Sequence, residues 1–203
     1  MPTLHFVHDP MCSWCYAFVP TWRLIQAALP DSISVEYILG GLAPDSDRPM
    51  SPHAQVYIQE NWRRIQSIAP DTEFNFEFWT RCIPRRSTYP ACRAVLAAKY
   101  FGPHHEEAMI EKIQVAYYRE ARNPSDVDTL CELAGEVGLN VEGFREWMEG
   151  DTCEAMLESN LQKTRALGVT GFPSLVLEMD HRYAIIPHDY TDPQITLAAV
   201  GVR

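Results

Sequence analysis

Two cysteines separated by two residues, Cys12 and Cys15, are the side chains whose type and spacing most directly indicate chemistry. The alternating apolar run from Leu4 to His8 ends at Asp9-Pro10, just before them. After the cysteines, apolar residues recur at the spacing of one helix face: Phe18, Trp22, Ile25 and Leu29. The stretch therefore predicts a strand, a tight turn and a helix that begins at Cys12.

A thiol at the start of a helix is well placed for nucleophilic attack. The first turn of a helix has unpaired backbone N–H groups and a partial positive charge. A thiol there ionises more easily, and the thiolate is the form that attacks a disulfide. Cys15 lies one turn later on the same face, within reach to resolve a mixed disulfide on Cys12. This pair therefore predicts thiol–disulfide exchange.

Structural zinc also uses cysteine pairs at this spacing, which offers a different interpretation. A zinc site usually has four ligands, often with a second pair at a characteristic spacing. His5 and His8 lie just upstream, but residues three apart in a strand point to opposite faces of the sheet. We therefore expect no bound metal, and a metal-binding or merely structural Cys-x-x-C module stays an alternative.

The bulk composition limits the classes of partner. The chain has 203 residues, and 17 basic against 27 acidic residues give a net charge of −10. This charge argues against nucleic acid or an anionic membrane as the main partner. No segment is long and apolar enough to span a membrane and nothing before the first strand resembles a signal peptide, so we expect a cytoplasmic protein. There the other cysteines are expected to be reduced core residues: Cys82, Cys92, Cys131 and Cys153.

Strand patterns stand at both ends of the chain, with helix patterns between them. Ile33 to Leu39 alternates as a second strand. Residues 51–168 are mainly helical in pattern, apart from Phe74 to Trp79, which predicts a strand or an aromatic loop. Two further strands are expected around a turn at Asp180-His181: Ser174–Met179 and Arg182–Pro187. A final short helix is expected from Asp192 through Val200.

Several helix ends are marked by capping residues. Ser51 precedes a proline at the first helical position, and Asn140 begins a short helix. Ser125 with Asp128 resembles a capping box, with Asp in place of the usual Glu. Gly138 is expected to close the helix that follows this box.

The order of these elements is β-α-β, a block of helices, then β-β-α. Two sequential domains would leave the first strands without enough sheet partners. We therefore predict an α/β fold in which one sheet domain, residues 1–45 and 168–203, is interrupted by a helical insertion over residues 46–167.

Three motifs resemble the thioredoxin fold: CSWC at a helix start, Pro20 inside that helix, and GVTGFPSLVL before the closing hairpin. The helical block between the second and third strands resembles the DsbA-like branch of this fold. HDPMCSWCYAF is similar to a group of signal-less, predicted protein-disulfide isomerases in that branch. The specific motifs cover residues 6–22 and 168–178. The resemblance implies a mixed central sheet flanked by helices, with an all-helical insertion.

The resemblance also implies roles for individual residues. Cys12 would be the exposed nucleophile and Cys15 the buried resolving thiol. Pro173 would be a cis-proline that faces them, with Phe172 and Thr170 on the edge that binds substrate.

Residues around this core are given supporting roles by the same resemblance. Ser13 and Trp14 would tune the reduction potential, because residues between the cysteines affect the stability of the thiolate. Trp14 would also offer an apolar surface to a partner. STYPACRAVLAAK resembles a stretch that faces the active site in this family, which would place Tyr89 and Pro90 in the cleft.

The chain departs from the family pattern in two ways. Many relatives have a buried acid six residues before the nucleophile, where this chain has Phe6. His8 or Asp9 would then have to relay the proton of Cys15. The common proline between the cysteines is also absent, which leaves the reduction potential open.

Three functions therefore compete. The first is a disulfide oxidoreductase or isomerase that acts on protein or small-molecule thiols and disulfides, with no cofactor beyond its own redox-active disulfide and with glutathione as a candidate co-substrate. The second is a glutathione-dependent isomerase or transferase of the hydroxychromene-carboxylate isomerase or kappa type, which tends to have serine in place of Cys12. The third is the non-catalytic module. The sequence does not indicate the oligomeric state.

Overall fold

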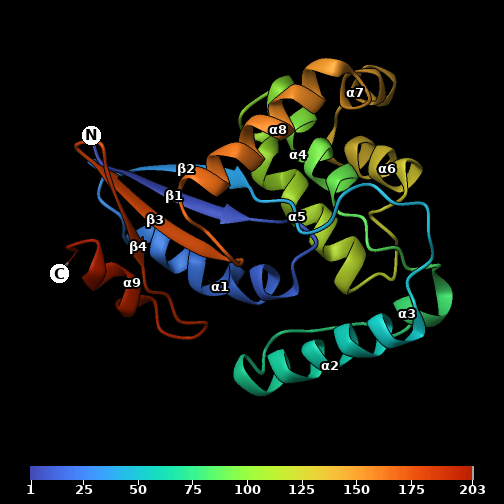
Figure 1. The fold of residues 1–203 in the computed structure, drawn as a ribbon, viewed down its shortest axis with the longest axis horizontal. Helices are drawn as coiled ribbons and strands as arrows, with labels where there is room; N and C mark the ends of the chain where they lie inside the picture. Colours follow the sequence, from blue (N-terminus) through green and yellow to red (C-terminus); the bar gives the residue numbers. More distant parts are fainter. Residues whose placement is uncertain (203) are drawn as a thin grey trace.

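The computed structural model describes residues 1–202. It contains a mixed four-stranded sheet, which lies on the left of the view in Figure 1. The strands lie in the order β2-β1-β3-β4. β1 pairs in parallel with β2, and β3 pairs in antiparallel fashion with both β1 and β4. The bounds of the strands are β1 (Thr3–His8), β2 (Ser34–Leu39), β3 (Ser174–Met179) and β4 (Arg182–Ile186).

Helices cover both faces of this sheet. α1 (Ser13–Ala28) and α9 (Pro193–Ala199) pack on one face, where Leu4 and Phe6 of β1 meet Phe18 and other residues of α1. α8 (Asp151–Ala166) lies beside β2 on the opposite side from α1, and the Asn160 side chain accepts a hydrogen bond from the Leu39 amide at 3.1 Å. Residues therefore alternate between an α1 face and an α8 face along β1, as the strand pattern predicts.

The remaining helices stand between β2 and β3 in the sequence. The central one is α4, in which eight of thirteen residues are buried. α4 contacts α5, α6, α7 and α8, and so forms the middle of a second core. The bounds are α2 (Pro52–Ile68), α3 (Phe78–Arg81), α4 (Tyr89–Phe101), α5 (His105–Tyr118), α6 (Val127–Val137) and α7 (Val141–Met148).

The helical region touches the sheet directly. The Lys163 ammonium of α8 lies 2.7 Å from a carboxylate oxygen of Glu36 on β2. α8 therefore links the helices to the sheet, although the predicted division places it inside the insertion. The boundaries of the two predicted domains stay a prediction.

Two local predictions are settled by the structure. Residues 74–77 form a loop, and Phe78 and Trp79 begin α3, so the segment is not a strand. Its aromatic side chains pack on Trp62, with 4.8 Å between the ring centroids of Trp62 and Phe74. The prediction of a capping box at Ser125 is wrong, because α6 begins at Val127 and its N-cap residue is Asp126. The Ser125 hydroxyl instead donates a hydrogen bond to the carbonyl of Ser87.

The closing hairpin agrees with the sequence prediction. Both turn residues, Asp180 and His181, have positive φ angles of 51° and 59°. Two consecutive residues in this region give the tight turn that matches the twist of paired strands. Within residues 1–202, no helix combines the length and apolar character needed to cross a bilayer.

Candidate active site

The turn between β1 and α1 holds Cys12 at the amino end of α1. The Cys12 amide donates to the Asp9 carbonyl at 3.0 Å, and the Tyr118 hydroxyl donates to the Met11 carbonyl at 2.7 Å. Cys12 is the N-cap residue, with an extended backbone. Its sulfur accepts the amide of Cys15 at 3.4 Å. This is the N-terminal position that the sequence predicts, where amide dipoles favour a negative sulfur.

Cys12 is less open than the sequence leads us to expect. It retains 5% of its surface, against 1% for Cys15. The reason is the loop before β3, because the Cys12 thiol lies against Phe172 and donates to its carbonyl at 3.5 Å. The expected exposed nucleophile is therefore a largely covered thiol whose open side faces a cleft.

Cys15 is a buried, neutral thiol. Burial raises the pKa of Cys15 well above its ordinary value, and the neighbouring Cys12 sulfur raises it further. A buried thiol with a raised pKa must lose its proton before it can attack. The two cysteines therefore have different environments although they share one helix turn.

The loop at Phe172 carries the predicted cis bond, which joins Phe172 to Pro173. Pro173 is buried and Thr170 is exposed. The Phe172 ring occupies the space beside Gly40, where an added Cβ atom would lie 2.1 Å from the ring. This contact fixes the ring at the carboxyl end of β2.

A cleft opens in front of Cys12. Its volume is about 210 Å³. Its walls come from the start of α1, from α2, from the chain before α4 and from Phe172. The lining residues are Met11, Cys12, Ser13, Trp14, Leu42, Met50, Tyr57, Ile58, Asn61, Trp62, Arg85, Arg86, Thr88, Tyr117 and Phe172.

The helical stretch expected to face this cleft contributes differently from the prediction. Thr88 lines the cleft, whereas Tyr89 and Pro90 are not among its lining residues. Tyr89 instead lies beside Gly41, and Pro90 lines an outer hollow with Arg93. Neighbouring side chains at the start of a helix point in different directions, and the sequence motif alone does not show which of them faces the cleft.

The residues between the cysteines are half-buried. Trp14 packs against Tyr190, with 5.2 Å between ring centroids, and the Arg64 guanidinium lies 5.8 Å from its ring. Trp14 therefore forms part of the cleft wall while it also contacts the segment between β4 and α9.

Asp9 joins three segments around the cysteines. Its carboxylate accepts hydrogen bonds from the amides of Met11 and Leu42, from the Thr88 hydroxyl at 2.7 Å and from the Cys92 thiol. Burial raises the pKa of Asp9, while these hydrogen bonds act in the opposite direction. Asp9 thus holds the turn before Cys12 against the loop after β2 and the start of α4.

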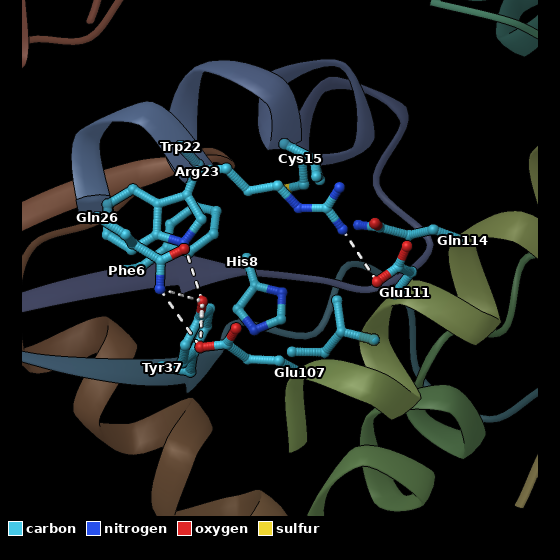
Figure 2. A pocket seen from close by; sticks show the side chains of 12 residues that line it. Phe6, His8, Cys15, Trp22, Arg23, Gln26, Tyr37, Glu107, Glu111 and Gln114 are labelled. Carbon is cyan, nitrogen blue, oxygen red and sulfur yellow. Dashed lines mark hydrogen bonds and ion pairs between the residues drawn. The ribbon is translucent and has the colours of Figure 1, made fainter. Parts of the chain in front are cut away.

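His8 faces a second cavity, which is lined by residues of α1 and α5. This cavity of about 70 Å³ is also lined by Cys15, Tyr37, Glu107 and Gln114. Figure 2 shows the His8 ring among these side chains, with Cys15 from α1 and Glu107 from α5 around it. The His8 Nε2 atom is buried without a hydrogen-bond partner in residues 1–202. Burial, with a contribution from Lys99, lowers the pKa of His8 to about 3.

The two histidines of β1 lie on opposite faces, as predicted. His5 lies between Glu36 and Glu178, with nitrogen–oxygen distances of 3.0 and 2.9 Å. In the described part of the chain, no group of three or more His, Cys, Asp or Glu side chains is arranged to hold a metal ion.

This arrangement is that of a thioredoxin fold with a helical insertion, in which a Cys-x-x-C pair opens the first helix. The chain belongs to the DSBA-like thioredoxin domain family, whose model matches residues 3–192. The family and fold predicted from the motifs are therefore confirmed.

Individual relatives agree with this assignment. The structure is similar to a "putative protein disulfide isomerase" from Nitrosomonas europaea, with a TM-score of 0.85 and 25% identity over 98% of this chain and 95% of that one. It is also similar to the cytosolic disulfide reductase DsbM from Pseudomonas aeruginosa, with a TM-score of 0.75 and 28% identity over 91% and 89% of the two chains. A further DsbM structure contains GSH.

One curated relative is a longer protein. The ClpXP adapter protein SpxH from Halalkalibacterium halodurans is 22% identical over 177 residues, which are 85% of this chain. The match spans 57% of SpxH, so this chain corresponds to little more than half the length of that relative.

Proposed function

We propose that this chain is a cytoplasmic thiol–disulfide oxidoreductase that cycles Cys12 and Cys15 between dithiol and disulfide. The observation that carries this proposal is the position of the Cys12 sulfur at the start of α1, where it accepts a hydrogen bond from the Cys15 amide and lines a cleft. Substrates would be protein or small-molecule disulfides, and no further cofactor is needed for this chemistry.

The first step is attack by Cys12. Its thiolate forms a bond to one sulfur of the substrate disulfide, the substrate S–S bond breaks, and the leaving sulfur takes up a proton as a thiol. The resting Cys12 thiol donates to the Phe172 carbonyl. This hydrogen bond is lost when Cys12 ionises, which leaves the backbone edge at Phe172 free to pair with a substrate peptide.

The second step is resolution by Cys15. Cys15 loses its proton, bonds to the Cys12 sulfur and breaks the mixed disulfide, so that the second substrate sulfur leaves as a thiol. In sum, an enzyme dithiol and a substrate disulfide become an enzyme disulfide and two substrate thiols. The substrate would be positioned by Pro173, Phe172 and Thr170. The reduction potential would be tuned by Ser13 and Trp14. Thr88 lines the cleft at the position that the sequence predicted for Tyr89.

Of the two candidate relays for the Cys15 proton, we favour His8 over Asp9. His8 and Cys15 line the same cavity, which has room for water, and Nε2 has no other partner in the described chain. The Asp9 carboxylate already accepts four hydrogen bonds. Water in the cavity would connect the two groups, and His8 would act through it as a hydrogen-bonding group.

In a reducing compartment the reaction would run mainly as reduction or isomerisation. Two molecules of glutathione would return the Cys12–Cys15 disulfide to the dithiol and leave as glutathione disulfide. The similarity to a cytosolic disulfide reductase that has been solved with GSH supports this direction.

Single substitutions at the two cysteines test the proposal through insulin reduction and trapping of mixed disulfides. Cys12→Ser is expected to abolish insulin reduction, because the nucleophile is lost. Cys15→Ser is expected to accumulate a mixed disulfide on Cys12, because nothing resolves it.

Other outcomes would favour the competing functions. Activity indifferent to Cys12→Ser would exclude the oxidoreductase. Tight binding of one zinc ion per chain would favour a metal-binding module. Glutathione-dependent turnover of a non-disulfide electrophile would favour the isomerase or transferase class.

A further inference from the structure

The charge that lines the cleft in front of Cys12 is opposite to that of the whole chain. The net charge of the chain is −10. The only ionisable carboxylate or guanidinium groups among the cleft-lining residues of the described chain belong to Arg85 and Arg86. The cleft that contains the nucleophile of this acidic protein is thus lined by positive charge.

The two arginines differ in how they are engaged. Arg85 forms an ion pair with Asp126 and donates to the Ser125 carbonyl at 2.8 Å. Arg86 is exposed and makes no ion pair or hydrogen bond within residues 1–202. Its charge reaches the cleft wall: burial raises the pKa of Tyr117, and Arg86 acts in the opposite direction. Arg86 is therefore the guanidinium that is available to a ligand.

The other walls of the cleft suit the uncharged part of such a ligand. Trp14, Ile58 and Phe172 offer apolar surface, while Asn61 offers an amide group. A guanidinium binds carboxylates with paired N–H donors that match their geometry. The cleft thus combines a carboxylate-binding group with the nucleophilic sulfur.

We propose that Arg86 determines substrate specificity, by selecting low-molecular-weight disulfides that carry carboxylates. This inference rests on the proposed function, because Cys12 must react with the disulfide. Arg86 would hold a substrate carboxylate while the Cys12 thiolate bonds to the nearer sulfur and the other half leaves as a thiol.

Three disulfides of similar size separate charge from shape: bis(2-carboxyethyl) disulfide, bis(2-hydroxyethyl) disulfide and cystamine. The measurement is the second-order rate at which the reduced protein is oxidised by each, at low ionic strength. We expect Arg86→Gln to slow the dicarboxylate about fivefold, to leave the neutral disulfide within about twofold, and to speed cystamine. High salt should reduce these differences, because it weakens the attraction between the exposed guanidinium and an approaching carboxylate.

Two controls isolate the position of the charge. Arg182→Gln removes the same charge from an exposed residue of β4 that forms no ion pair in the described chain, and it should leave all three rates unchanged. Arg86→Lys should restore part of the preference for the dicarboxylate.

The outcomes separate this inference from the proposed function. If Arg86→Gln leaves the ratio of dicarboxylate to neutral rates unchanged, or slows all three disulfides equally, the specificity role of Arg86 is wrong. If the native protein reacts with none of the three through Cys12, the proposed function itself fails. A selective loss with the dicarboxylate supports both.

Discussion

Cys12 and Cys15 have the same side chain, and their surroundings give them different roles. The Cys12 sulfur accepts a helix amide and lines a cleft, whereas burial holds the pKa of Cys15 above its usual range. One thiol is thus placed for attack from the cleft, and the other stays protonated until a mixed disulfide forms. This division supports an exchange mechanism in which the order of attack is fixed.

His8 makes stability depend on pH. Its pKa is lowered from 6.5 to about 3 in the folded chain, so below pH 6.5 the unfolded chain binds a proton that the folded chain excludes. Stability should therefore fall as the pH falls from about 6.5 toward 3. Between pH 7 and pH 5, His8 should account for about 2 kcal/mol of the loss in unfolding free energy.

The measurement is urea unfolding of the native chain and of His8→Gln at both pH values. Glutamine cannot gain this charge, so the variant should lose about 2 kcal/mol less than the native chain. The exposed His53 of α2 gives the control, His53→Gln, which should retain the full dependence. Equal losses in all three proteins would contradict a neutral, buried His8.

The same variant tests the proton relay. If His8 assists Cys15 through water in the cavity, His8→Gln should slow the release of the mixed disulfide by about tenfold. It should also shift the pH profile of that step, because the hydrogen bonding that stabilises the Cys15 thiolate changes. The initial attack by Cys12 should be unaffected. An unchanged resolution rate with an unchanged pH profile would leave Asp9 as the remaining candidate.

At the scale of elements, one contact determines how the end of β2 packs against the loop before β3. Gly40 leaves room for the Phe172 ring, whose carbonyl accepts the Cys12 thiol. Gly40→Ala places a Cβ atom 2.1 Å from that ring, so the ring and its loop must move. We expect a loss of about 1–3 kcal/mol in unfolding free energy and a raised KM for disulfide substrates.

A matched control and a second substitution test this contact. Gly171→Ala lies in the same loop with no heavy atom within 4 Å of its added Cβ, and it should change neither quantity by much. Phe172→Ala should remove most of the stability penalty of Gly40→Ala, because the clash disappears. Additive penalties in the double variant would contradict a direct contact between the two residues.

At the scale of the whole molecule, the sequence predicts the elements better than their assembly. The alternation in β1 and the hairpin turn at Asp180-His181 are local signals, and both agree with the structure. The capping box at Ser125 fails because Ser125 bonds to the distant Ser87 instead. A local sequence pattern cannot predict a hydrogen-bond partner that is distant in the sequence and is brought close only by the tertiary fold.

The same limit applies to the site. Cys12, Cys15 and Pro173 carry recognisable motifs, but the cleft walls come from α2 and from the chain before α4. Arg86 was detectable only as half of an Arg-Arg pair just before the STYP motif. No spacing rule distinguishes it from Arg85, because the difference lies in the ion pair of Arg85 with Asp126.

The central claim is that one pair of cysteines exchanges two electrons with substrate disulfides. Its most direct test is equilibration of the protein in glutathione buffers of graded potential, followed by thiol alkylation and mass spectrometry of the peptides. We predict a single two-electron transition in which Cys12 and Cys15 lose alkylation together while the other four thiols stay reduced. A transition that maps to other cysteines, or glutathione attached to Cys12 without disulfide formation to Cys15, would contradict it.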